Sequence, residues 1–178
     1  MFKRLVMAAL IVVLVAAVFQ VTQPTRAQDD PEDQAARNKA SIIKLYDETN
    51  AGNAEFLREL LAPDFISYGG AGFEDLEGPD AFMDLYYTFI DAFPDLQFEV
   101  THIIAEGDLV AARGLQIGTH EGNFLGMVPP TNKEVVWTGT AIFRFNDEGQ
   151  IIERWQDLDQ LGLFIQLGVV PPFGSPGG

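Results

Sequence analysis

The stretch LQFEVTHIIAEGDLVAARGLQIGTH, residues Leu96–His120, decides the fold class of this 178-residue chain. Apolar and polar residues alternate along its first half, which is the period of a strand with one buried face. The EGD at residues 106–108 is a hairpin turn, and residues 109–120 form the returning strand. The alternation puts His102 on the same face as Phe98, so we expect His102 on the apolar side of the sheet, bordering any pocket there.

Two further strands and a helix follow this hairpin. The first strand spans residues 134–145, and residues 146–149 turn the chain into a last strand over residues 151–156. The last helix spans residues 158–168. Three residues of the long strand share one face and are expected to line the pocket: Trp137, Ala141 and Phe143.

Helices occupy the part of the chain before the hairpin. Helical spacing predicts helices over residues 35–50, 53–61 and 79–93, with Asn53 as the cap of the second and Pro63 ending it. A short strand is expected at residues 65–68. The third helix carries aromatic residues at helical spacing, and of these Tyr86 and Phe89 are expected at the pocket.

This order of elements predicts an α+β domain. A long antiparallel meander must curve to cover its own apolar face, and the N-terminal helices can close the open side. We therefore expect a curved antiparallel sheet wrapped round those helices as a cone with an internal pocket, plus a C-terminal helix. An apolar pocket with a few polar groups is where small ligands bind, so the expected partner is a small apolar molecule.

The N-terminal segment has the layout of a secretory signal peptide. Lys3 and Arg4 precede an uncharged run over residues 5–19, and small residues flank a cleavage point after Ala27. We expect residues 1–27 to be a signal peptide, residues 35–168 the domain and residues 169–178 a flexible tail. Residues 28–34 are an acidic tether, with the first turn of a helix as the alternative. The protein is then secreted or periplasmic. An uncleaved membrane anchor is the alternative, and is the one expected contact with a membrane.

The composition excludes several classes of function. Cleavage after Ala27 removes three of the 11 Lys and Arg residues and none of the 26 acids, so the formal charge becomes 8 − 26 = −18. Such a surface does not suit nucleic acid or anionic membranes. The chain has no cysteine, which excludes disulfides and thiolate catalysis. The two histidines lie on different strands without acids at ligand spacing, so neither a metal site nor a cofactor is expected.

The end of the last strand carries three polar candidates. Asp157, with Gln160 three residues later, fits a capping box, and Asp159 then lies in the first helical turn. The other interpretation is that one of these carboxylates is a general base at a pocket mouth. Gln156 lies on the opposite face from Trp155, either as a buried amide or as a donor to a substrate carbonyl.

His120 ends the returning strand and has two interpretations. It can anchor the following loop by a hydrogen bond, or act as an acid or base at the pocket rim.

Five stretches in order resemble the SnoaL-like polyketide cyclase and ester cyclase family, within the nuclear-transport-factor-2-like superfold. They are LLAPDF (60–65), GPDAF (78–82), AFPDLQFEV (92–100), GTHEGNFLGMVPPT (118–131) and IIERWQDLDQLGLFIQLG (151–168). The resemblance implies the cone fold, homo-oligomers and an aldol-type ring closure in which a pocket aspartate exchanges the proton. That aspartate falls at Gln156, a partner histidine at Ala141 and an asparagine at Ser67.

Three functions remain open on this basis, and whether the protein is an enzyme stays open with them. The first is cyclisation or isomerisation of an apolar carbonyl or ester compound, with Gln156 polarising the oxygen and His120 or Asp159 as base. The second is non-catalytic binding of such a compound. The third is epoxide-hydrolase-like hydrolysis, for which Asp157 with Arg113 or Arg154 supplies part of an Asp–Arg–Asp arrangement.

Overall fold

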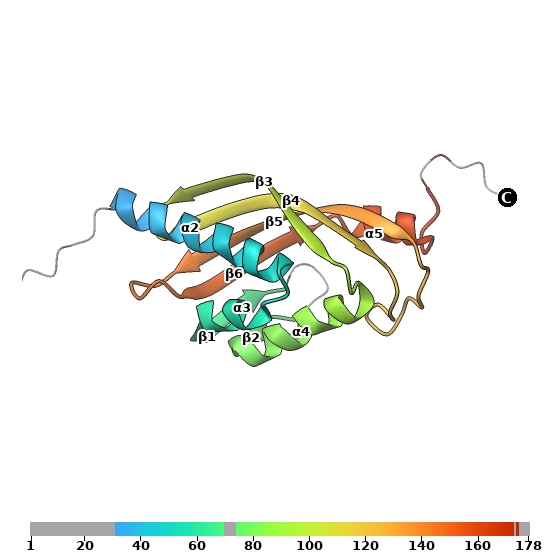
Figure 1. Cartoon of the computed structure of the whole chain (residues 1–178), viewed down its shortest axis with the longest axis horizontal. Coiled ribbons are helices and arrows are strands. Elements are labelled where there is room, and N and C mark those ends of the chain that lie inside the picture. Colours follow the sequence, from blue (N-terminus) through green and yellow to red (C-terminus); the bar gives the residue numbers. More distant parts are fainter. Residues whose placement is uncertain (1–30, 70–73, 173, 175–178) are drawn as a thin grey trace, which may run out of the picture. The chain divides into compact units, whose positions relative to one another are not determined.

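The computed structural model describes residues 31–69, 74–172 and 174 (Figure 1). The expected signal segment, residues 28–30 of the tether, residues 70–73 of the glycine-rich loop and residues 173 and 175–178 of the tail lie outside the described residues. Within the described ranges, no helix is both long and apolar enough to cross a membrane.

The described chain is an α+β domain, as predicted. Its helices are α2 (Pro31–Asn50), α3 (Ala54–Leu60), α4 (Gly78–Ala92) and α5 (Gln160–Leu167). Its strands are β1 (Leu61–Tyr68), β2 (Leu76–Glu77), β3 (Gln97–Glu106), β4 (Leu109–Thr119), β5 (Glu134–Phe145) and β6 (Ile151–Leu158).

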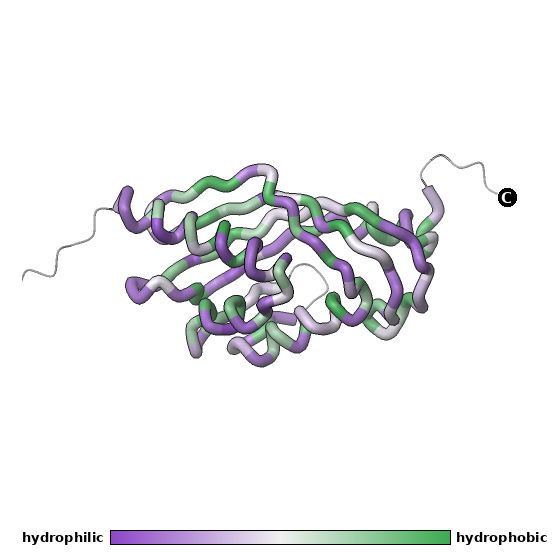
Figure 2. The backbone as a smooth tube through the Cα atoms, in the orientation of Figure 1, coloured by the Kyte–Doolittle hydropathy of each residue, from purple (hydrophilic) through white to green (hydrophobic). Residues whose placement is uncertain are grey.

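The strands form one sheet in the order β2-β1-β6-β5-β4-β3. The sequence predicted antiparallel pairing, and every pair is antiparallel except β1 with β6, which makes the sheet mixed. The long strands curve, and α2 lies across one face of them (Figure 1). Hydrophobic and hydrophilic residues alternate along these strands (Figure 2), which leaves one face apolar for the helices to cover.

A bulge in β3 overturns the expected position of His102. The pairing of β3 with β4 shifts register between Val100 and His102. One extra residue reverses the facing of all that follow, so Ile103 turns inward while His102 is exposed and Ile104 is 71% exposed. Strict alternation therefore holds only as far as Val100.

Two other local predictions needed correction, and the tether follows its helical alternative. The helix α2 begins at Pro31, so residues 31–34 form its first turn; proline is tolerated there, and the helix dipole favours Glu32 and Asp33. The side chain of Asn53 bonds Glu48 and does not cap α3. Pro63 lies inside β1, where a register irregularity accommodates it.

The apolar side chains gather in two clusters. The first lies between α2, α3, α4 and the sheet, and contains Ile42, Phe65, Val110 and Ile151 among its most buried members. The second joins the end of α4, the loop after β4, and α5, around Phe93 and Trp137. The site described below borders the first cluster.

The loop after β4 is anchored at both ends, and His120 is one of the anchors. Thr119 donates to the Asp95 carboxylate from its backbone N–H at 2.6 Å and from its hydroxyl at 2.7 Å. The N–H of Thr131 donates to His120 Nδ1 at 3.3 Å, so the proton of the neutral ring is on Nε2. His120 is 0% exposed, and this burial lowers the pKa of its imidazole. The loop-anchoring interpretation is therefore the one that fits.

Asp159, and not Asp157, caps the last helix. Its carboxylate accepts from the N–H of Gly162 at 2.8 Å, and Gly162 leaves room for it because a Cβ there would collide with the carboxylate. Asp157 still belongs to β6, where it pairs with Thr140 and is exposed. The cap lies two residues later than predicted because pairing with β5 extends β6 as far as Leu158.

We predict that Asp159→Ala lowers the free energy of unfolding by about 1 kcal/mol, because it removes the cap of α5. The matched change Asp157→Ala is expected to stay within about 0.5 kcal/mol of wild type, since Asp157 is exposed. Urea unfolding at neutral pH measures both. A loss with Asp157→Ala as large as that with Asp159→Ala would contradict the assignment.

A second prediction concerns pH. A histidine in the unfolded chain takes up a proton near pH 6.5, whereas buried His120 resists it. The unfolded state then binds more protons, so stability falls as pH drops from about 6.5 towards the folded pKa. Urea unfolding at pH 7.5 and 5.5 should show this loss in wild type and in His102→Gln, but much less in His120→Gln. Equal losses in the two variants would refute it.

Candidate functional site

Small residues on the inner face of the sheet leave space beneath α2. Ala112 of β4 pairs with Ala141 of β5, and Gly114 pairs with Gly139. All four line a cavity of about 110 Å³. This is close to the roughly 150 Å³ that holds benzene in an engineered cavity, so the space suits a small organic molecule.

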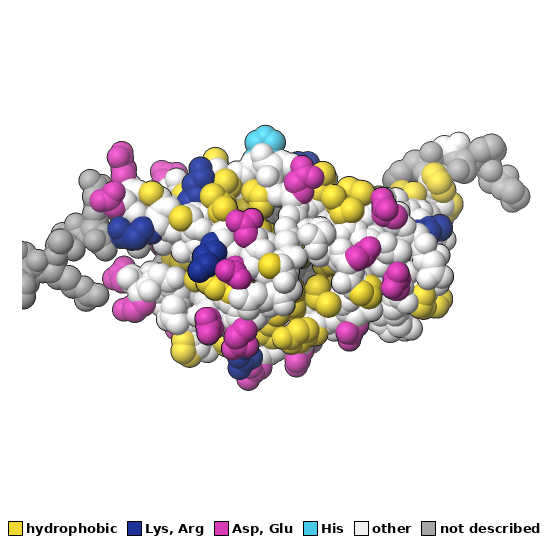
Figure 3. All heavy atoms as spheres, in the orientation of Figure 1, with side chains coloured by type: hydrophobic (Ala, Val, Ile, Leu, Met, Phe, Trp, Pro, Cys, Tyr) yellow, Lys and Arg dark blue, Asp and Glu magenta, His cyan; other side chains and the backbone are white. Residues whose placement is uncertain are grey.

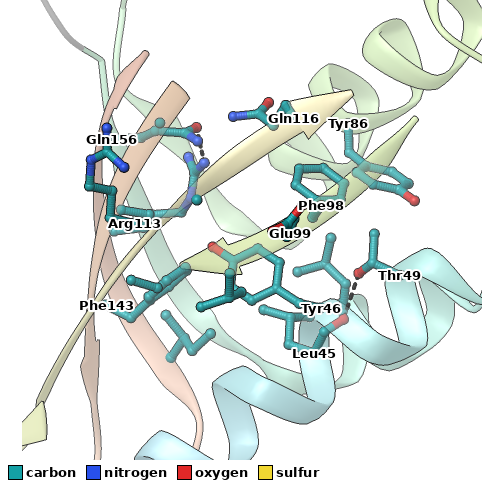
Figure 4. A pocket seen from close by; sticks show the side chains of 18 of the residues that line it. Leu45, Tyr46, Thr49, Tyr86, Phe98, Glu99, Arg113, Gln116, Phe143 and Gln156 are labelled. Carbon is teal, nitrogen blue, oxygen red and sulfur yellow. Dashed lines mark hydrogen bonds between the residues drawn. The ribbon is translucent and has the colours of Figure 1, made fainter. Parts of the chain in front are cut away.

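Most of the cavity wall is apolar. Helices supply Leu45, Leu57 and Phe82, and strands supply Leu61, Phe98, Val100, Leu115, Phe143 and Ile151. Figure 4 shows Leu45 and Tyr46 projecting from α2 on one side, with Gln116 and Gln156 on the strands opposite. Polar groups are therefore few and mostly face one another across the space.

Arg154 of β6 is the central polar group. Its Nη1 donates to Ser67 Oγ at 3.1 Å, its Nη2 donates to Gln156 Oε1, and its guanidinium lies 4.8 Å from the centre of the Phe82 ring. Burial lowers the pKa of Arg154 to about 10. The side chain is half-buried and stays cationic at neutral pH.

Tyr46 of α2 faces this group. Asn50, one turn further along, bonds the backbone of Phe98 through both its amide atoms at 2.8 Å, which ties α2 to β3. The Tyr46 and Phe98 rings lie 5.8 Å apart. Burial raises the pKa of Tyr46, and the charge of Arg154 opposes that rise. The hydroxyl points towards the strands (Figure 4) and makes no hydrogen bond to any described residue.

Gln116 of β4 adds an amide to the wall. The side chain is buried and fits above Gly139, where a Cβ would come within 2.7 Å of its Nε2 and of Leu158 Cδ2. The lack of a side chain at Gly139 is therefore what allows this amide to lie against the sheet.

Some of the residues expected at the pocket lie there. Gln156, Tyr86, Ala141 and Phe143 line the cavity, and Ser67 holds Arg154. The alternation along β5 and β6 carried this information, because it placed Gln156 and Ala141 on inner faces.

The other expected site residues lie elsewhere. The carboxylate of Asp159 bonds the backbone of α5, and Asp157 is exposed. The remaining four are His120, Phe89 and Trp137, which belong to or pack beside the second apolar cluster, and His102, which is exposed. His120, Phe89 and Trp137 lie outside the cavity wall because the inner face of the long sheet covers both clusters, and His102 does so because of the bulge in β3.

Sequence reasoning missed Tyr46 and Gln116 and gave Arg154 only a minor part. Arg154 precedes Gln156 by two residues, so strand alternation puts both side chains on one face, which was a usable signal. The Asp–Arg–Asp arrangement of an epoxide hydrolase is absent from the described residues, because Arg154 forms no ion pair with Asp157 or any other carboxylate there.

Chemically, the site offers hydrogen-bond donors in an apolar space. Arg154 has N–H groups left over, and Gln156 keeps its NH2 because its oxygen accepts from Arg154. The lining carboxylate is Glu99, which is exposed at the edge of the cavity. Among the described residues no three His, Cys, Asp or Glu side chains lie together as metal ligands.

Several solved structures are similar to this chain. AclR, a proposed hydroxylase from Streptomyces galilaeus, is 32% identical with a TM-score of 0.70, over 80% of this chain and 86% of AclR. A proposed SnoaL-like polyketide cyclase from Jannaschia sp. CCS1 is 28% identical with a TM-score of 0.69, over 77% and 95% of the two chains. IdmH, a proposed polyketide cyclase from Streptomyces antibioticus, is 33% identical with a TM-score of 0.63, over 74% and 98%.

A family comparison agrees with these structures. No protein of curated function matches the chain. The sequence model of the SnoaL-like polyketide cyclase family matches residues 40–167, which include every residue of the cavity wall. The chain belongs to the SnoaL-like polyketide cyclase family and has its cone-type α+β fold.

Proposed function

We propose that this protein binds a small apolar carbonyl compound in the cavity beneath α2, with the carbonyl oxygen directed at Arg154 and Gln156. One observation carries the proposal: an apolar cavity in which unused N–H donors converge on one wall. Ligand sites of this kind combine apolar walls with a small number of placed polar groups.

The donors gain strength from their surroundings. A hydrogen bond from a cationic donor is roughly twice as strong as one from a neutral donor. Apolar surroundings also screen the electrostatic attraction less than water does. Ser67 and Phe82 hold the guanidinium in one place, so a ligand does not have to order it. The apolar body of the ligand would then contact Leu45, Phe98 and the small residues of the floor.

Catalysis by the expected bases is not part of this proposal. Asp159, Asp157 and both histidines lie away from the cavity, so none can take a proton from a ligand held there. The family resemblance puts the aspartate of the cyclases at the position of Gln156, and a neutral amide cannot act as a base at ordinary pH. Binding and polarisation of the carbonyl are what the described residues support.

We predict that filling the cavity removes binding of a small apolar ketone. Ala141→Leu puts a branched side chain between Ala112 and Gln156, so its affinity for acetophenone should fall at least about tenfold. Ile142→Leu, one residue along but on the outer face, should bind like wild type. Ligand-observed NMR titration measures both, with thermal unfolding to show that each variant folds. No acetophenone binding by wild type, or undiminished binding by Ala141→Leu, would refute the proposed function.

A further inference from the structure

We propose that the cavity prefers an apolar carboxylate to a neutral carbonyl compound, with Arg154 as the partner of the anionic group. This inference rests on the proposed function, since it names the class of ligand for the same cavity. It follows from the positive charge of Arg154, which forms no ion pair with a carboxylate among the described residues.

The partners of Arg154 are all uncharged. They are the Ser67 hydroxyl, the Gln156 amide oxygen and the face of the Phe82 ring. Arg58 and Arg144, by contrast, pair with carboxylates, and their side chains are 43% and 40% exposed. A cation that is partly withdrawn from water is ordinarily paired, because the loss of hydration is costly unless an anion compensates.

Acidic groups near Arg154 do not supply the missing charge. Tyr46 faces the guanidinium, but burial raises the pKa of its phenol, so it stays protonated at neutral pH. Glu153, the preceding residue on the strand, points to the other face, where it bonds Tyr68 and Arg144. Glu99 lines the cavity but is exposed and makes no ion pair with Arg154. The positive charge of the guanidinium is therefore available to an anionic ligand.

The arrangement also suits the two oxygens of a carboxylate. Arg154 donates through five N–H groups in a plane, and two of them are used by Ser67 and Gln156. The NH2 of Gln156 and the hydroxyl of Tyr46 can donate to the second oxygen from either side of the cavity. A neutral ketone has a single carbonyl oxygen, so it would occupy one of the two positions that the carboxylate oxygens take. It would also leave the charge of Arg154 without an anionic partner.

The acidic surface of the protein makes a preference for an anionic ligand informative about the local contact. The chain carries 26 acidic against 11 basic residues, and acidic side chains are spread over the face in Figure 3. This field repels anions at long range. Tighter binding of an anion than of a neutral analogue therefore has to come from a local contact.

The experiment compares three ligands of nearly equal size with the full domain: benzoate, benzamide and acetophenone. We expect benzoate to bind wild type at least about tenfold more tightly than either neutral compound, because a charge-assisted contact replaces a neutral one. Isotope-edited NMR titration gives the affinities and shows whether the shifts map to the cavity. Excess benzoate should also raise Tm.

Two variants with the same change of charge locate the contact. Arg154→Met should lose the preference for benzoate and its rise in Tm. Its affinity for acetophenone should fall as well, but by less than its affinity for benzoate, because Gln156 and the apolar wall still contact the neutral ligand. Its own stability should hold or increase, because a hydrophobe replaces an unmatched, partly buried charge. Arg58→Met removes an exposed arginine outside the cavity and should keep the preference.

The outcomes separate the two proposals. If wild type binds acetophenone in the cavity but benzoate no more tightly, the inference is wrong and the proposed function stands. If the preference survives in Arg154→Met, the anion partner is another group, such as Arg113 at the rim, and the inference is again wrong. If none of the three compounds binds the cavity, both proposals fail. Because wild type alone decides the ligand preference, a failure of Arg154→Met to fold does not remove the test.

Discussion

A half-buried positive charge, held at the wall of an apolar cavity by neutral partners, is the constraint from which this site follows. Arg154 reaches inward from β6 with no carboxylate beside it among the described residues, and a hydroxyl, an amide oxygen and an aromatic ring keep it in place. Such an arrangement costs stability in the free protein. A local cost of this kind is typical of functional sites, where the compensating group arrives with the ligand.

The fold leaves the Arg154 guanidinium accessible to a ligand in the cavity. Ala112 and Ala141, paired on β4 and β5, leave a space that larger side chains would fill. The double hydrogen bond of Asn50 to Phe98 fixes α2 above that space, and with it Tyr46. The motifs around Asp95 and His120, which identify the family, serve a different purpose: they anchor a loop beside the second apolar cluster.

Much of the fold could be predicted because the patterns that carry it are local. The hairpin at residues 106–108, the bounds of β5 and the inward facing of Ala141 and Phe143 all follow from period-two alternation and turn residues. The same patterns predicted the order of helices and strands. That order and five motifs then indicated the family, and membership is confirmed.

The failures have physical reasons of their own. The bulge at Val100–His102 adds a residue without any compositional mark, so the facing of His102 could not be read from alternation. Asp157 and Asp159 both fit a cap, and only the pairing of Leu158 with Gly139 decides between them. Arginine is ordinarily a surface residue. The inward face that Arg154 shares with Gln156 was therefore not enough to predict Arg154 as the central polar group of the site.

A crystal structure of the protein with bound benzoate tests the role of Arg154 most directly. We expect benzoate in the cavity beneath α2, with its carboxylate within hydrogen-bond distance of the Arg154 guanidinium and its ring against Leu45 and Phe98. Benzoate with its carboxylate turned to solvent and its ring against Arg154, or benzoate bound only outside the cavity, would contradict it.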